Sequence, residues 1–271
     1  MLTLLRVELW KLGHSKLFYA SLALFGVYAL VLLVGFRQML GPLTAGRESG
    51  SMYVYLAFVL AFYPFVVAVA IIHAGGSVSQ ELRAGTLRYT LLAPVPRWQL
   101  VVVKLLSTGV AVAAVTLFLF MALASLSAFL GEGNTMTLDV WAAAKPEGRP
   151  ATLLSSEETL QRCLLALPLV AYSAVANASF AFLLSTLVPS PVLAITVPLS
   201  LFFISSIIQI SPVIPKLKPY LPTRQMFFWD EVFARDIAWD RVANGVIFHG
   251  LMMGVLLGLT LALFVTRDVT T

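Results

Sequence analysis

The sequence predicts an all-α integral membrane protein with about six transmembrane helices. Of its 271 residues, 59% are hydrophobic and only 11% are charged, whereas a soluble domain has about a quarter of its residues charged. The apolar residues are also grouped into runs long enough to cross a hydrocarbon core of about 30 Å as α-helix. We treat residues 1–271 as a single transmembrane domain.

The first element is an amphipathic helix over residues 1–16. Leu2, Leu5, Leu9 and Leu12 recur at helical spacing, and the basic side chains fall between them. Such a helix is suited to lie in the headgroup layer of a membrane. We therefore expect an interfacial helix ahead of the first span.

Six apolar runs follow, and polar segments separate most of them. The expected spans are 17–36, 53–73, 101–130, 163–188, 192–210 and 242–265. The longer connections are 77–100, 131–161 and 211–241. Ser155 and Glu158 have capping-box spacing, which predicts a short helix before the fourth span. The aromatic-rich connection 211–241 indicates either a re-entrant hairpin or an aromatic belt that anchors the sixth span.

The basic residues nearest the first span set the expected orientation. Lys11 and Lys16 precede that span, and positively charged flanks favour the cytoplasmic side. Both termini and the segment 77–100 are then cytoplasmic, and the loops 131–161 and 211–241 are external.

Several classes of function are disfavoured by what the sequence lacks. Away from their ends the spans carry no Asp, Glu, Lys or Arg, which argues against ion-coupled transporters and intramembrane hydrolases. Residues 41–46 have the spacing of a phosphate-binding loop, but Arg47 and Glu48 stand where Lys and Ser/Thr are needed. We expect no enzyme activity, no cofactor and no metal site in this chain, since its one cysteine and three histidines are scattered. No basic cluster indicates nucleic-acid binding.

The segment 77–100 reads as a helix end, a break, a short helix and a new start. Gly85 can adopt the left-handed conformation that ends a helix, and Thr86 can cap the next one. Leu87 and Leu91 supply an apolar face, and Pro94 ends the short helix. This element can dock a soluble partner or lie on lipid, and the pattern alone does not separate these alternatives.

Several motifs resemble the type-2 ABC-transporter permeases, the membrane subunits of bacterial ABC exporters. The residues that carry the resemblance are Ser79, Glu81, Gly85-Thr86-Leu87, Leu91, Pro94-Val95, Arg97 and Lys104, together with the stretches 4–11 and 264–268. The resemblance implies that 77–100 contains a coupling helix that docks on a separate cytoplasmic ATPase, which holds the ATP and magnesium. The implied docking residues are Glu81, Arg83, Gly85, Thr86, Leu87, Arg88, Leu91, Pro94 and Arg97.

The resemblance also implies the assembly and the membrane. Six spans make half a transporter, so this chain is expected to pair with a second copy or a relative in the bacterial cytoplasmic membrane. An extracytoplasmic accessory protein is compatible with this arrangement. The expected function is the permease subunit of an ATP-driven exporter. The alternative is a non-transporting subunit that couples ATP hydrolysis to an extracytoplasmic or motility assembly.

Two further patterns have open interpretations. Tyr55, Phe58, Phe62 and Phe65 form one stripe of the second span. The resemblance implies that this span lines the pathway, but packing against neighbouring helices explains the stripe as well. Gly250, Gly254 and Gly258 form a repeated small-residue face in the sixth span, for which we expect close helix packing.

Overall fold

The structure is a computed structural model, and every structural statement below refers to the residues that it describes. These are 1–40, 50–61, 65–87, 96–130, 135–137, 152–211, 215–218, 221 and 223–266.

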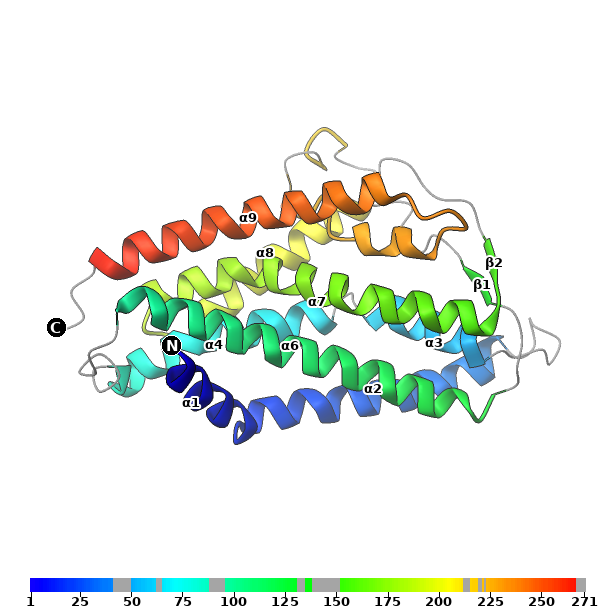
Figure 1. The fold of residues 1–271 in the computed structure, drawn as a ribbon, viewed down its shortest axis with the longest axis horizontal. Coiled ribbons are helices and arrows are strands. Elements are labelled where there is room, and N and C mark those ends of the chain that lie inside the picture. The colour runs from blue at the N-terminus through cyan, green and yellow to red at the C-terminus, as the bar shows by residue number, and fades with distance from the viewer. Residues whose placement is uncertain are drawn as a thin grey trace.

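The fold is an elongated bundle of helices (Figure 1). The helices are α1 Leu2–Gly13, α2 Lys16–Leu40, α3 Gly50–Ala61, α4 Val67–Ala84, α6 Arg97–Ser127, α7 Ser156–Leu187, α8 Pro191–Ile210 and α9 Trp239–Thr266. Five of them, α2 and α6 to α9, are long and apolar enough to cross a membrane. The prediction of an all-α membrane protein is confirmed.

The described residues of the second predicted span are helical. They belong to α3 up to Ala61 and to α4 from Val67, and α4 continues beyond the span through polar residues to Ala84. The predicted loop 77–100 is therefore helical over its first eight residues, 77–84. Hydropathy detects where a chain leaves the hydrocarbon, but a helix can continue beyond that point until a residue such as Gly85 ends it.

Serine caps begin two of the long helices. The Ser155 hydroxyl accepts a hydrogen bond from the Glu158 backbone N–H at 3.2 Å, which confirms the predicted cap. The helix that follows is not short, however, because it continues without a break as α7. The predicted loop 131–161 thus ends at residue 155. Ser190 caps α8 in the same way, with Pro191 in the first turn.

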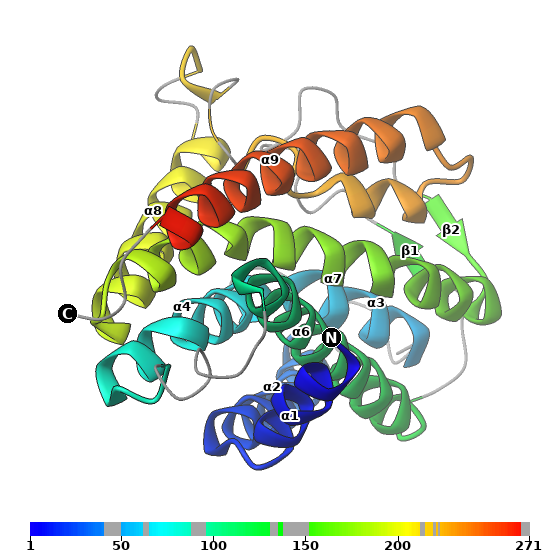
Figure 2. The ribbon, with the colours of Figure 1, turned by 60° about the vertical axis from the view of Figure 1, so that its left-hand side comes forward.

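α7 is the central helix of the bundle. It packs against α3, α4, α6, α8 and α9 (Figures 1 and 2). Many of its buried positions are Ala or Ser, and small side chains let helix backbones approach closely in a membrane. A comparable approach joins α4 to α8, where a Cβ added at Gly75 would lie 2.7 Å from the Ala194 carbonyl oxygen.

Two elements that were not predicted lie in the predicted loops 131–161 and 211–241. Strands β1 Thr135–Thr137 and β2 Thr152–Leu154 pair antiparallel. A 3₁₀ helix, η4 Phe228–Phe233, is buried and packs against α7 and α9. The aromatic side chains of η4 thus pack inside the bundle, and both interpretations of 211–241 stay predictions.

The bundle has two chemically different ends (Figure 1). One end holds α1, the C-terminal ends of α4 and α9 and the N-terminal end of α6, and we call it the α1 end. The other holds β1, β2 and the start of α7, and we call it the hairpin end. The described parts of the predicted coupling segment lie at the α1 end.

Candidate functional site

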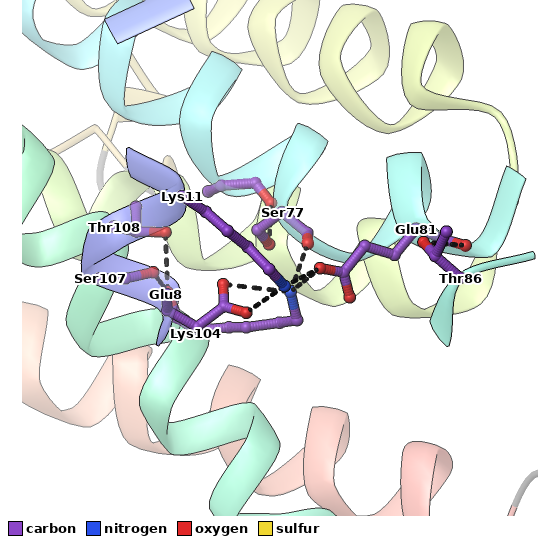
Figure 3. A network of polar contacts seen from close by, with 9 residues as sticks. Glu8, Lys11, Ser77, Glu81, Thr86, Lys104, Ser107 and Thr108 are labelled. Atoms are coloured by element: carbon purple, nitrogen blue, oxygen red, sulfur yellow. Dashed lines mark hydrogen bonds and ion pairs between the residues drawn. The ribbon is translucent and has the colours of Figure 1, made fainter. Parts of the chain in front are cut away.

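Four charged side chains from three helices meet at the α1 end. Glu8 and Lys11 come from α1, Glu81 from α4 and Lys104 from α6, and Figure 3 shows them pointing toward one another. We call them the charge cluster. The inward face of α1, which carries Leu5, Leu9 and Leu12, packs toward α6 and so delivers Glu8 to the site.

Lys104 is the centre of the charge cluster. Its side chain is 1% exposed, and its ammonium lies 3.0 Å from Glu81 and 3.4 Å from Glu8. It also donates a hydrogen bond to the Ser77 carbonyl oxygen at 2.9 Å. An ammonium has three donors, so three acceptors on α1 and α4 surround it. A buried cation needs such partners because it has lost its water.

Lys11 closes the charge cluster on its more exposed side. Its ammonium lies 2.8 Å from Glu8 and 2.9 Å from Glu81. Burial by itself would lower the pKa of Lys11, but hydrogen bonds to the two carboxylates outweigh burial and raise it. Burial would likewise raise the pKa of Glu81, but Lys104 and Lys11 together lower it. The charged forms of Lys11 and Glu81 are therefore favoured by their neighbours in the cluster.

A cavity of about 200 Å³ adjoins the charge cluster. Its lining includes Glu8, Lys11, Glu81 and Lys104. The second carboxylate oxygen of Glu81 is buried and has no partner among the described protein atoms.

The helix that carries Glu81 ends one turn later. Gly85 has φ +69°, and the Thr86 backbone N–H donates to the Glu81 carbonyl oxygen at 3.0 Å. This is the left-handed helix end that the sequence predicted. No atom lies within 4 Å of a Cβ added at Gly85, so the glycine is needed for backbone conformation rather than for space.

The nine expected docking residues are only partly brought together. Arg83, Gly85 and Thr86 are exposed at the end of α4, whereas Glu81 turns inward to the charge cluster. Leu87 corrects the expectation, since it is 1% exposed and belongs to the apolar core of this chain rather than offering an anchor to a partner. Three further candidates, Arg88, Leu91 and Pro94, lie outside the described residues.

Arg97 has a structural contact at the same end. Its guanidinium donates to the Phe264 carbonyl oxygen of α9 at 3.4 Å. A cation near a helix C-terminus is favourable, because the unpaired carbonyl groups there carry partial negative charge. Arg97 therefore ties the start of α6 to the end of α9, a role that the sequence analysis did not anticipate.

The aromatic stripe packs inside this chain, which was the alternative to lining a pathway. Tyr55 and Phe58 are buried and lie edge-on to aromatic rings of η4, with centroid separations of 4.9 and 6.3 Å. Phe65 packs on a tyrosine of α2 at 5.0 Å. Phe62 lies outside the described residues.

The glycine face of α9 is closely packed at one of its three positions. A Cβ at Gly250 would lie 2.9 Å from the Tyr172 hydroxyl, but nothing lies within 4 Å at Gly254 or Gly258. Within this chain, close packing is therefore seen at Gly250 and not at Gly254 or Gly258. The tightest approach on α9 is at Gly245, where a Cβ would collide with the Phe228 side chain of η4.

Sequence reasoning named each member of the charge cluster in a motif but did not place them together. A signal was present at Lys104, which directly follows three consecutive valines. A lysine inside an apolar run needs a buried partner. The sequence does not say which of several acids at helix ends supplies it, because that depends on how α1, α4 and α6 pack.

Comparison with known protein families supports the resemblance. The family model described as "ABC-2 family transporter protein" matches residues 4–205, which include α1, the charge cluster and the end of α4. No curated protein matches the chain in a sequence search. Because the family match covers well over half of the sequence, this chain belongs to the ABC-2 transporter family.

Proposed function

We propose that this ABC transporter permease subunit is half of an exporter and that a separate cytoplasmic ATPase drives it from the α1 end. In this proposal a second permease chain completes the pathway across the membrane. The α1 end is the cytoplasmic end, and the ATPase contacts the exposed end of α4 around Arg83 and the segment after Gly85.

The observation that carries this proposal is the charge cluster. It joins α1, α4 and α6 one turn before the point where α4 ends. Removing one partner of a buried ion pair costs about 3–5 kcal/mol, because the other charge is left uncompensated. The cluster therefore resists separation, and a push on the end of α4 is passed to α1 and α6 instead of bending α4 alone.

The same push reaches the rest of the bundle through close packing. α4 packs along α7 and α8, and at Gly75 its backbone is in contact with the backbone of α8. Arg97 links the start of α6 to the end of α9. A movement that begins at the end of α4 can thus be transmitted to α6 through the charge cluster, to α7 and α8 through close packing, and to α9 through Arg97.

The proposal is tested by ATP turnover of the reconstituted complex of permease and ATPase. We expect Lys104→Met to retain the bound ATPase but to reduce turnover to that of the ATPase alone. Lys16→Met is the matched control, since Lys16 is an exposed lysine at the same end, outside the charge cluster. Glu81→Gln, which removes a charge and keeps the side-chain shape, provides a second variant if Lys104→Met does not fold.

Two outcomes would overturn the proposal. One is full permease-dependent turnover in both folded cluster variants, which would show that the cluster transmits nothing. The other is ATP turnover by the purified permease alone. The alternative function, a non-transporting coupling subunit, would use the same charge cluster. It predicts the same loss of ATP turnover in the cluster variants, but no movement of cargo across the membrane of sealed vesicles.

A further inference from the structure

A large apolar cavity lies between α7, α8 and α9, on the other side of the bundle core from the charge cluster. Its volume is about 690 Å³. α8 and α9 each pack along α7 but contact each other very little, and the cavity is lined by residues of all three helices. Figure 2 shows the course of these three helices. The walls include Phe180, Pro198, Phe202, Phe248, Met252 and Leu256.

The cavity opens sideways, toward the position of the bilayer. Leu201 of α8 and Leu251 and Val255 of α9 line it and are 50%, 66% and 64% exposed. These three residues lie near the middle of their spans, so their exposed surfaces face hydrocarbon in a membrane. A molecule can therefore enter the cavity directly from the lipid phase.

One polar group in the cavity is held in a fixed orientation. Asn177 of α7 donates through its amide nitrogen to the Ser173 carbonyl oxygen at 2.8 Å, and that nitrogen lies 3.4 Å from the His249 Nε2 atom. His249 Nδ1 is 2.9 Å from the Gly245 carbonyl oxygen. A carbonyl only accepts, so Nδ1 carries the proton and Nε2 is an acceptor.

The hydrogen-bond pattern leaves Asn177 with one group to offer a ligand. Its amide nitrogen donates to the Ser173 carbonyl oxygen and lies near His249 Nε2, an atom that the Ser173 hydroxyl also approaches at 3.3 Å. Its carbonyl oxygen has no hydrogen-bond partner among the described residues. The other polar lining residue, Thr223, pairs with the Ser205 hydroxyl at 3.3 Å, a contact that uses only one of the two hydroxyl hydrogens. The cavity thus presents apolar walls, the Asn177 carbonyl as an acceptor and the Thr223 hydroxyl as a second polar group.

We propose that this cavity binds a lipid-soluble molecule with a hydrocarbon body and one hydrogen-bond donor, such as a long-chain alcohol. Sites for small molecules commonly have volumes of about 300–1,000 Å³, apolar walls and a few polar groups that fix orientation. A plain hydrocarbon chain fills the walls but leaves the Asn177 carbonyl unsatisfied, which is unfavourable in a membrane. A ligand with a hydrocarbon body and one O–H or N–H group fills the apolar walls and also donates a hydrogen bond to the Asn177 carbonyl.

The test compares two photoreactive probes on the purified chain in lipid nanodiscs. One is a long-chain alcohol that carries an aliphatic diazirine, and the other is the matching alkane without the hydroxyl. We expect the alcohol to label peptides of α7, α8 and α9 saturably and to bind about fivefold more tightly than the alkane, as expected for one buried hydrogen bond.

Two substitutions on the same face of α9 show whether the label reports the cavity. Leu251→Trp fills the cavity mouth. Saturable labelling of this variant by the alcohol probe should be no stronger than labelling of the unmodified chain by the alkane probe. Leu259→Trp is the matched control, because Leu259 is exposed on α9 but does not line the cavity. Asn177→Leu should remove the difference between the two probes.

Equal labelling by alcohol and alkane, or equal effects of Leu251→Trp and Leu259→Trp, would show bulk lipid contact only and would overturn the proposal. The probe comparison needs only the unmodified chain, so it stands even if Asn177→Leu does not fold. The assay contains no ATPase and does not depend on the coupling role of the charge cluster.

Discussion

At the scale of residues, this protein places its buried charges where three helices meet. Glu8 and Lys11 share one turn of α1, whereas Glu81 and Lys104 lie far along the chain, yet each ammonium lies within 3.4 Å of both carboxylates. Their signs and their positions at helix ends are visible in the sequence. Their mutual contact is not, because it follows from the packing of α1 and α4 on α6.

Lys104→Met should lower the thermal stability of the purified permease. The substitution fills the space of the side chain but leaves Glu8 and Glu81 with Lys11 as their remaining partner in the cluster. Removing one member of a buried ion pair typically costs about 3–5 kcal/mol, and the remaining contacts of Lys11 with both carboxylates should hold the loss at the lower end of that range. Thermal unfolding in detergent measures this, with exposed Lys16→Met expected to change little. An unchanged melting temperature for Lys104→Met would mean that the cluster is not formed.

The charge cluster should make stability depend on pH only at the extremes. Glu81 has a pKa below its ordinary value of 4.5, so its contribution is present above pH 4.5 and is lost as pH falls further. Lys11 has a pKa above 10.5, so its contribution is present below that pH and is lost as pH rises beyond it. Stability from the cluster should therefore be level between these values. Glu81→Gln should flatten the acid limb of the profile, whereas Glu157→Gln, on the exposed first turn of α7, should not.

At the scale of elements, the sequence predicts helix ends better than helix partners. Gly85 and Ser155 were identified from local chemistry, since a left-handed glycine and a serine cap act on their own backbone. Hydropathy alone ends the second span at residue 73, but the glycine at position 85 correctly marks where α4 ends. The short strands β1 and β2 and the 3₁₀ helix η4 are too brief to produce a periodic pattern.

Two substitutions at Gly85 should separate backbone conformation from side-chain size. Asn tolerates a positive φ and Val does not, and neither meets a neighbour there. Gly85→Val should strain the end of α4 by about 1–2 kcal/mol or more and reduce permease-stimulated ATP turnover, whereas Gly85→Asn should retain most of it. Equal turnover in the two variants would exclude a role for this helix end. Leu87→Asp is not informative here, since burial of Leu87 predicts loss of the fold.

Arg162 should hold η4 against the start of α7. Its guanidinium donates to the carbonyl oxygens of Val232, Ala234 and Arg235 at 2.7, 3.1 and 3.3 Å. Hydrogen bonds from a charged donor contribute about 1.5–3 kcal/mol, so Arg162→Met should speed amide exchange in η4 by roughly thirtyfold. The control is Arg224→Met, in an exposed residue before η4. Exchange that does not change in Arg162→Met would assign the anchoring of η4 to apolar packing alone.

At the scale of the whole molecule, the fold class and the order of the apolar helices could be predicted from the sequence. Which face of each helix packs inside the chain, and against which other element, could not. The periodicity of Tyr55, Phe58 and Phe65 indicates one helix face, but only the structure shows that η4 and α2 cover it. The glycines of α9 likewise share a face, of which only Gly250 is packed tightly within the chain. A sequence pattern identifies which residues share a helix face, but the element that packs on that face depends on the arrangement of the complete bundle.

The central claim is that the α1 end receives the ATPase, and site-specific photo-crosslinking tests it most directly. A photoreactive amino acid placed at Arg83, exposed at the end of α4, should crosslink to the ATPase in the assembled complex. The same amino acid at Gln161, near the start of α7 at the hairpin end, should not. Crosslinks to the ATPase from residue 161 and none from residue 83 would contradict both the orientation and the docking site.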